Sequence, residues 1–296
     1  MIGTYKIYKH GELVRAQKNL ITDLGRRTIL DFLAGQNNSW SDFLALGTSA
    51  VPVTLSDRYL GFEFLRAPVA VKVADFNTDA ITMKAEFYDP SAGWIYELGL
   101  FPTNGAPESA DSTTTLLSAF NQEVEPWSAG VWNEVDFRLG SESLELATTT
   151  GTTLWAENMY YGSALSQYTP ADILDLAYFT QDTNASLAGV RLHTDENNYF
   201  EYTFVPQTVA GYHVQSFTKG DFIAVGTPDW NIITSLSVGV QAGAGGGTTV
   251  QFDGLAITTL NTYADYGVVS RAVLDDPLYK EVSEEIDVEY VIQFSV

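Results

Sequence analysis

Catalytic chemistry is the first question, because 37 Asp and Glu residues offer many carboxylate pairs. Glycoside cleavage uses two carboxyl groups that face each other across a cleft, one of them with a raised pKa. Pairs such as Asp172 with Asp175, or Asp195 with Glu196, are expected by chance in so acidic a chain. The sequence has no nucleophile elbow, phosphate-binding loop or histidine metal motif, and no cysteine. It therefore predicts no catalytic residue and no enzyme, with a polysaccharide-degrading enzyme as the alternative.

Aromatic residues suggest a second kind of chemistry. Aromatic faces cover the C–H surface of sugars, while Asn, Asp and Gln side chains bind the hydroxyl groups. Trp155, Tyr199 and Trp230 are the candidate glycan-binding residues, and a place in the hydrophobic core is the alternative for each. Tyr199 and Tyr202 have opposite strand parity, so at most one of them faces a given surface of a sheet.

The charge of the chain excludes some partners. Lys and Arg total 15 against 37 Asp and Glu, a formal net charge of −22. Such a surface repels phosphate backbones and anionic lipid, so we expect no nucleic-acid partner and no membrane insertion. No apolar run approaches the roughly 18 residues of a membrane helix, and residues 1–11 alternate without a secretory core. We therefore expect synthesis in the cytoplasm without a signal peptide.

Periodicity predicts a mainly β chain that begins with a hairpin and one helix. The hairpin turns at His10 and Gly11, and the helix starts at Thr22 or Asp23 and ends at Gly35. The predicted apolar face of the helix consists of Leu24, Ile29, Leu30 and Leu33.

Strand spacing and a shift in composition predict two domains. Residues 139–261 hold only two of the 15 basic residues, and eight short strands in this region suggest a jelly-roll β-sandwich. Residues 195–198 and 243–247 are its predicted hairpin turns. The last strand, residues 286–296, alternates cleanly and needs partners, so we expect it to return to the N-terminal domain. The prediction is a small β domain, with one N-terminal helix, made of 1–139 and 262–296, into which a 140–261 sandwich is inserted.

Five segments, residues 19–25, 44–48, 93–100, 270–274 and 287–290, together resemble structural proteins of tailed bacteriophage particles. In such proteins a short helix precedes a small β domain that builds tail, baseplate, collar or fibre parts. Two further segments, residues 230–233 and 252–255, are similar to the jelly rolls of carbohydrate-binding modules inserted in such proteins.

The resemblance implies a structural virion protein that acts by assembly. Its partners would be further copies of itself, other virion proteins and, through the jelly roll, a host surface polysaccharide. The terminal strand and the polar loop 106–115 are the expected contact elements. A capsid decoration protein is one alternative, and a free carbohydrate-binding lectin or a polysaccharide-degrading enzyme is another.

The resemblance also implies a structural calcium ion, although no cofactor is expected to be required. Jelly-roll binding modules often tie their ends together with calcium held by carboxylates and carbonyls. Asp253 resembles such a ligand, and Glu142 or Glu145 would join it. A solvated aspartate in a turn is the alternative for Asp253.

Overall fold

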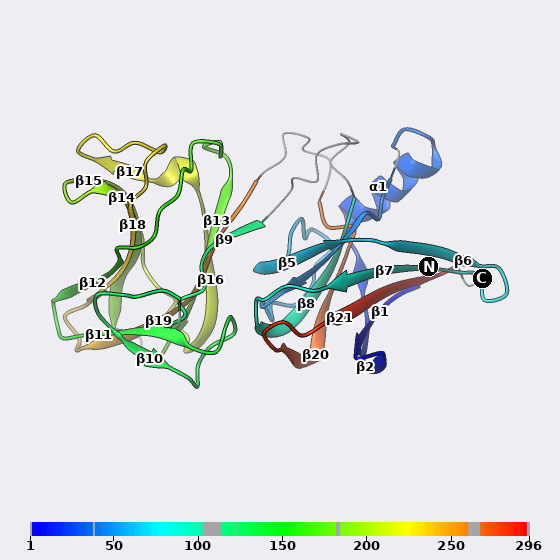
Figure 1. The fold of residues 1–296 in the computed structure, drawn as a ribbon, viewed down its shortest axis with the longest axis horizontal. Helices are drawn as coiled ribbons and strands as arrows, with labels where there is room; N and C mark the ends of the chain where they lie inside the picture. Colours follow the sequence, from blue (N-terminus) through cyan, green and yellow to red (C-terminus); the bar gives the residue numbers. More distant parts are fainter. Residues whose placement is uncertain are drawn as a thin grey trace. The chain divides into compact units, whose positions relative to one another are not determined.

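The chain forms two compact units, each built almost entirely of β-strands. The computed structural model describes residues 2–37, 39–102, 114–122, 124–181, 184–259 and 267–294. Unit 1 comprises Met1–Thr114 and Asn261–Val296, and unit 2 comprises Thr115–Leu260 (Figure 1). Most of the predicted contact loop 106–115 lies outside the described residues.

Unit 1 contains two five-stranded antiparallel sheets and the helix α1. The first sheet has the order β2-β1-β21-β7-β6 and the second the order β3-β20-β8-β4-β5. The bounds are β1 (Ile2–Lys9), β2 (Glu12–Lys18), β3 (Leu20–Ile21), α1 (Asp23–Leu33), β4 (Phe43–Gly47), β5 (Glu63–Pro68), β6 (Val71–Asp75), β7 (Ala80–Phe87), β8 (Gly93–Phe101), β20 (Ser270–Lys280) and β21 (Ile286–Gln293).

The C-terminal strand returns to the N-terminal region, as its alternation predicted. β21 lies between β1 and β7 and is antiparallel to both. Every second side chain of β21 is buried, which the alternation of apolar residues requires. The β1–β2 hairpin turns through His10 and Gly11, whose φ angles are 51° and 80°. Two successive positive φ values match the turn that such tight hairpins favour.

Helix α1 begins where it was predicted to begin, but its buried face differs. The Oγ1 atom of Thr22 accepts a hydrogen bond from the amide of Gly25 at 2.9 Å and caps the helix. The buried residues are Gly25, Thr28 and Ile29. Leu30 and Leu33, on the predicted apolar face, are 65% and 72% exposed, so this face is covered only in part. The helix packs through its first two turns, and the apolar residues of its last turn remain outside.

Gly25 explains why α1 packs through its N-terminal end. A Cβ atom at position 25 would overlap the carbonyl group of Val269, the residue before β20. The amide of Thr22 donates a hydrogen bond to that same carbonyl at 3.1 Å. Glycine is therefore required here because the helix approaches backbone closely.

A buried ion network joins two of the segments of unit 1 that carry the phage resemblance, residues 93–100 and 270–274. Glu97 on β8 is fully buried, and its Oε2 lies 2.7 Å from Nη2 of Arg271 on β20. Arg271 also binds Asp57 at 2.7 Å. The amides of Ser49, Gly61 and Phe62 donate hydrogen bonds to the Glu97 carboxylate. These segments therefore meet as one structural feature, with buried charges that are paired and hydrogen-bonded.

Unit 2 is a β-sandwich of two antiparallel sheets. One sheet has the order β10-β11-β19-β13-β16, with β9 also paired to β19, and the other has the order β12-β18-β14-β15-β17. The bounds are β9 (Thr114–Ser118), β10 (Val131–Asn133), β11 (Ser143–Thr148), β12 (Thr153–Asn158), β13 (Ile173–Thr180), β14 (Ala185–Asp195), β15 (Asn198–Phe204), β16 (Gly211–Thr218), η1 (Lys219–Asp221), β17 (Ile223–Val225), β18 (Ser235–Ala242) and β19 (Thr248–Thr258). Consecutive strands β11 to β14 alternate between the sheets, as in a jelly roll.

Two sequence predictions for this region need correction. Residues 115–139 belong to unit 2 and not to the first domain, because β10 pairs with β11 and Phe120 lies in the unit 2 core. Residues 243–247 do not form a hairpin turn. They connect β18 in one sheet to β19 in the other. Residues 195–198 do connect a hairpin, between β14 and β15.

The core of unit 2 lies between its sheets and consists of aliphatic and aromatic side chains. At one edge of this core the buried Lys219 donates hydrogen bonds to the carbonyls of Leu165 and Tyr168, at 2.7 and 2.6 Å. The part of the chain that the structure describes contains no helix long and apolar enough to span a membrane.

Candidate functional site

The outer surface of the sheet β12-β18-β14-β15-β17 carries the candidate site. Even-numbered residues of these strands, such as Ala156, Val190 and Val238, point into the core. Odd-numbered residues therefore point away from it. We call this surface the Trp155 face, and its residues are Trp155, Glu157, Arg191, His193, Tyr199, Glu201, Ser235 and Ser237.

Strand register places these residues in rows across the sheet. Trp155 is opposite Gly239, which is opposite Gly189 on the next strand. The following row holds Glu157, Ser237, Arg191 and Glu201, and the next holds Ser235, His193 and Tyr199. A Cβ atom at Gly239 would overlap the Trp155 indole, so glycine lets this ring lie close against the sheet.

Arg191 connects the two aromatic residues of the face. Its guanidinium carbon lies 3.8 Å from the ring centroid of Trp155 and 4.7 Å from that of Tyr199. Both distances are within the range of cation–π attraction. Nε of Arg191 donates a hydrogen bond to Oε2 of Glu201 at 2.6 Å, which fixes the guanidinium from the neighbouring strand. Both partners remain about a quarter exposed.

A depression of about 540 Å³ lies beside this cluster. His193 lies at the junction, with its ring centroid 5.1 Å from that of Tyr199 and its Nε2 2.9 Å from Oγ of Ser237. Burial lowers the pKa of His193, which favours a neutral imidazole. The depression is lined by Glu157, Met159, His193, Asp195, Glu196, Thr234 and Ser235.

The structure brings two of the three predicted glycan-binding residues together. Trp155 and Tyr199 share the Trp155 face, and Tyr202, of opposite parity, packs in the core against Phe217 at a centroid distance of 4.0 Å. Trp230 lies elsewhere. Its ring stacks on Phe200 at 3.7 Å, so this packing favours the alternative of a core residue for Trp230.

Asp253 and Glu142, the predicted calcium ligands, are both buried. Asp253 accepts hydrogen bonds from the amides of Arg138 and Leu139, at 3.0 and 3.3 Å, and burial raises its pKa to about 8. Glu142 accepts a hydrogen bond from the amide of Gln122 at 2.7 Å. Within the described residues, no group of three or more His, Cys, Asp or Glu side chains is placed to hold a metal ion. The donor set therefore does not fit a carboxylate-rich calcium site, and the calcium ion stays a prediction.

The carboxylate pairs considered for catalysis have structural partners. Asp172 accepts a hydrogen bond from the amide of Thr169 at 2.6 Å. Asp195 accepts hydrogen bonds from its own β-turn, chiefly from Asn198, which lowers its pKa. A general acid needs the opposite shift. The described carboxyl groups whose pKa burial raises are those of Glu97, Glu125 and Asp253, and each accepts backbone amide hydrogen bonds away from the depression.

Sequence reasoning missed most polar members of the Trp155 face. Arg191 was noted only as a rare basic residue, and Glu157, Ser235, Ser237 and Glu201 were not singled out. The usable signal was parity, because Arg191 and His193 alternate on one strand and Tyr199 and Glu201 on the next. Which strands are neighbours, however, depends on pairing between segments as far apart as β12 and β18.

Comparison with known proteins gives no family. No protein-family model matches the chain, and no curated protein matches it. A family 11 carbohydrate-binding module from Clostridium thermocellum, solved with a β-1,3-1,4-mixed-linked tetrasaccharide, is similar over 49% of this chain and 95% of its own, at 11% identity and a TM-score of 0.36. A family 30 carbohydrate-binding module is similar over 60% and 89%, at 15% identity and a TM-score of 0.34. The agarase AgWH50C matches over 50% of this chain but only 25% of its own, at 10% identity and a TM-score of 0.34. Likeness at this level carries no conclusion about function.

Proposed function

We propose that unit 2 binds a neutral polysaccharide on the Trp155 face, and that the chain is a non-catalytic structural component of a tailed-phage particle. The observation that carries the binding proposal is the contact of Arg191 with both Trp155 and Tyr199, beside a depression lined by carboxylates and hydroxyls. An aromatic surface next to convergent polar groups is the composition that sugar recognition needs.

The charges of the face favour an uncharged ligand. Glu157, Asp195 and Glu196 line the depression, and Glu201 lies in the same row of the sheet as Glu157. Carboxylates accept hydrogen bonds from sugar hydroxyls, but they repel uronate or sulfate groups. Arg191 is already paired with Glu201, so its charge is largely balanced. A neutral polysaccharide therefore fits better than an acidic one.

The roles of the residues follow from their places. Tyr199 would provide aromatic surface for the C–H face of a sugar ring, and Trp155, whose indole lies between Gly239 and the Arg191 guanidinium, would hold Arg191 in place and present its ring edge to the sugar. Arg191, held by Glu201, would donate hydrogen bonds to ring or glycosidic oxygens. Glu157, whose Oε1 already accepts a hydrogen bond from the buried Ser235, would bind hydroxyl groups at the near wall of the depression. Because sheet strands carry these side chains, little ordering entropy would be lost on binding.

Three alanine substitutions test the binding proposal. Neutral host-surface polysaccharides are titrated calorimetrically against the full chain and against Trp155→Ala, Tyr199→Ala and Trp230→Ala. Loss of an aromatic contact that contributes roughly 1–3 kcal/mol should weaken polysaccharide binding by Trp155→Ala about 5- to 150-fold, with little change in Tm. Trp230→Ala should lower stability more than Trp155→Ala, because the partly buried Trp230 ring packs against the core and stacks on Phe200.

Two results would reject this function. Equal affinity of wild type and Trp155→Ala would remove the Trp155 face as the binding surface. Release of new reducing ends from the polysaccharide, abolished by neutralising one carboxylate pair, would identify an enzyme and not a binding protein.

The resemblance of five segments supports the phage role, and so do the structural positions of residues from three of these segments. Glu97 comes from 93–100, Arg271 from 270–274 and Gly25 from 19–25, and each occupies a buried or closely packed position in unit 1. The resemblance therefore rests on residues that set a fold. Mass spectrometry of purified particles should detect the chain in stoichiometric amount. A chain absent from particles would leave a free lectin as the better description.

A further inference from the structure

The hairpin β6–β7 of unit 1 exposes an apolar edge. Every residue of the edge strand β6 is exposed, and Val71 and Val73 are 44% and 53% exposed. At the turn of the hairpin, Phe76 is 89% exposed. An unpaired strand edge with apolar side chains is a template for association with another chain.

Side-chain hydrogen bonds hold the turn that carries Phe76. The carboxylate of Asp75 accepts hydrogen bonds from the amide of Asn77 at 2.9 Å and from Oγ1 of Thr78 at 2.8 Å. Asp79 follows with a φ of 48°. These contacts fix the backbone on both sides of Phe76, so presenting its ring to a partner would require little further ordering. We call residues 75–79 the Phe76 tip.

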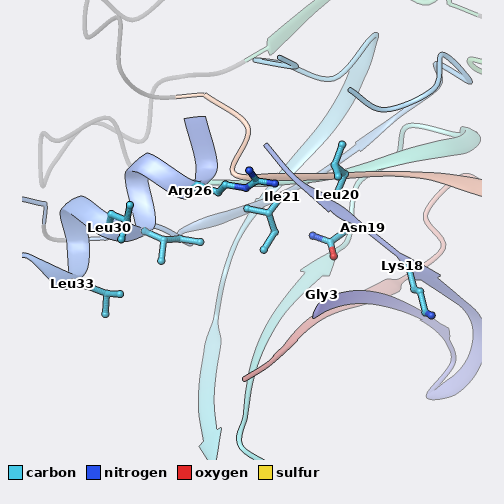
Figure 2. Close-up of a pocket in the computed structure, with 9 residues that line it drawn as sticks. Gly3, Lys18, Asn19, Leu20, Ile21, Arg26, Leu30 and Leu33 are labelled. Atoms are coloured by element: carbon cyan, nitrogen blue, oxygen red, sulfur yellow. The ribbon is translucent and has the colours of Figure 1, made fainter. Parts of the chain in front are cut away.

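The same unit contains an apolar groove of about 500 Å³ between α1 and β3 (Figure 2). Leu30 and Leu33 extend the buried Ile29 into this groove and stay 65% and 72% exposed. The residues that line the groove are Gly3, Lys18, Asn19, Leu20, Ile21, Arg26, Ile29, Leu30 and Leu33.

The charges of the tip and the groove are opposite. The groove contains Lys18 and Arg26, and its lining has neither Asp nor Glu, although Nη1 of Arg26 lies 3.5 Å from Oδ1 of Asp23 on the same helix. The Phe76 tip contains Asp75 and Asp79 on either side of the aromatic ring. In a chain with a net charge of −22, a groove with two cations favours an acidic and apolar partner. A second copy of this chain supplies one.

We propose that the groove between α1 and β3 receives the Phe76 tip of a second copy of this chain. Within one copy, β21 and β7 separate β1 from β6, about 14 Å at the usual strand spacing, so the tip is held away from its own groove. Tip and groove are different surfaces, which makes the contact heterologous. Repeating such a contact gives a ring if the rotation closes and a filament if it does not. The contact does not depend on glycan binding.

Sedimentation velocity over a range of concentrations tests the contact with two full-length variants. Phe76→Ser removes the apolar ring of the tip, and the double variant Leu30→Gln, Leu33→Gln makes the groove polar. All three side chains are exposed, so both variants should fold with an unchanged Tm. Each should raise the dissociation constant for self-association at least tenfold. Val282→Ser, at an exposed turn of the same unit, is the matched control and should associate like wild type.

Mixing the two variants gives the sharpest result. The tip variant keeps its groove, and the groove variant keeps its tip, so together they should form a one-to-one pair and stop there. Larger assemblies should appear only with wild type. A wild-type chain that stays monomeric overturns the proposal and leaves the groove to a different protein. Undiminished assembly of Phe76→Ser also overturns it.

Discussion

At the scale of single residues, most buried charges of this chain are structural. Arg271 is 3% exposed and binds Glu97, which is fully buried, and Asp57. Lys280 and Lys219 are also buried, and each donates hydrogen bonds to backbone carbonyls of connecting segments. A buried charge is tolerated only where such partners replace water. These residues therefore fix loops that apolar packing alone would leave undefined.

Arg271→Met should strongly destabilise unit 1. The substitution leaves Glu97 buried without its cation, and breaking a buried pair in this way costs about 3–5 kcal/mol. Urea unfolding should show the loss as a lower midpoint. Arg15→Met is the control, because the Arg15–Asp276 pair is exposed and should contribute less than about 1 kcal/mol. Equal effects of the two variants would contradict a structural role for the network.

The raised pKa of Asp253 predicts that the stability of unit 2 depends on pH. Its pKa is about 8 in the folded protein and 3.8 in the unfolded reference. The folded state holds the Asp253 proton more tightly than the unfolded state does. The contribution of this protonated carboxyl group to the free energy of unfolding is therefore complete below pH 4 and is lost as the pH rises to 8. The slope should reach about 1.4 kcal/mol per pH unit. Unfolding measured in the presence of a chelator, which removes calcium, should show this dependence on pH in wild type and not in Asp253→Asn. If calcium binds the carboxylate, adding calcium should instead stabilise unit 2 at high pH.

At the scale of elements, α1 depends on one glycine. Gly25→Ala improves helix propensity, yet it places a Cβ atom against the carbonyl of Val269. Because backbone cannot yield as a side chain does, we expect a net loss of about 1–3 kcal/mol. Arg27→Ala, on the exposed side of the same helix, should leave the unfolding midpoint almost unchanged. A stabilised Gly25→Ala variant would show that the helix does not pack this closely.

How much of each element could be predicted depends on how local its signal is. The His10–Gly11 turn, the Thr22 cap and the alternation of β21 are local, and all three were predicted. The exposure of Leu30 and Leu33 was not, because it depends on which part of α1 packs against the rest of unit 1. The connection 243–247 was also predicted wrongly. A glycine-rich turn has the same sequence pattern whether it connects two neighbouring strands of one sheet or passes from one sheet to the other.

Only part of the candidate site could be predicted, because its residues come together through the pairing of distant strands. Trp155 and Tyr199 were chosen for their chemistry and share the Trp155 face, although Trp155 is on β12 and Tyr199 on β15. Arg191 joins them because β14 and β18 lie between these strands. Trp230 has the same chemistry, but its stacking on Phe200 is a tertiary contact with no signature in sequence. Residue type identifies candidates, and pairing of distant strands decides which of them meet.

At the scale of the whole molecule, unit 2 is inserted between two strands that are neighbours in unit 1. Ser270 on β20 pairs with Leu100 on β8, so the chain leaves and re-enters unit 1 at adjacent positions of one sheet. Removal of Thr115–Leu260 would therefore leave two ends that a short flexible linker can join. The cost of closing a loop rises only slowly with its length, so the linker itself should have little effect on stability.

We therefore expect each unit to fold alone. A chain with Thr115–Leu260 replaced by a short Gly-Ser linker should unfold in one cooperative transition, and the isolated 115–260 segment should do the same. Each midpoint should lie close to a transition of the full chain in calorimetry. The isolated segment should also bind polysaccharide with the full chain's affinity per site, since the Trp155 face lies wholly within unit 2. The linker variant should still assemble through α1 and the Phe76 tip, which lie wholly within unit 1. A linker variant that is unfolded would mean that unit 1 needs its insertion, and that the two activities cannot be separated in this way.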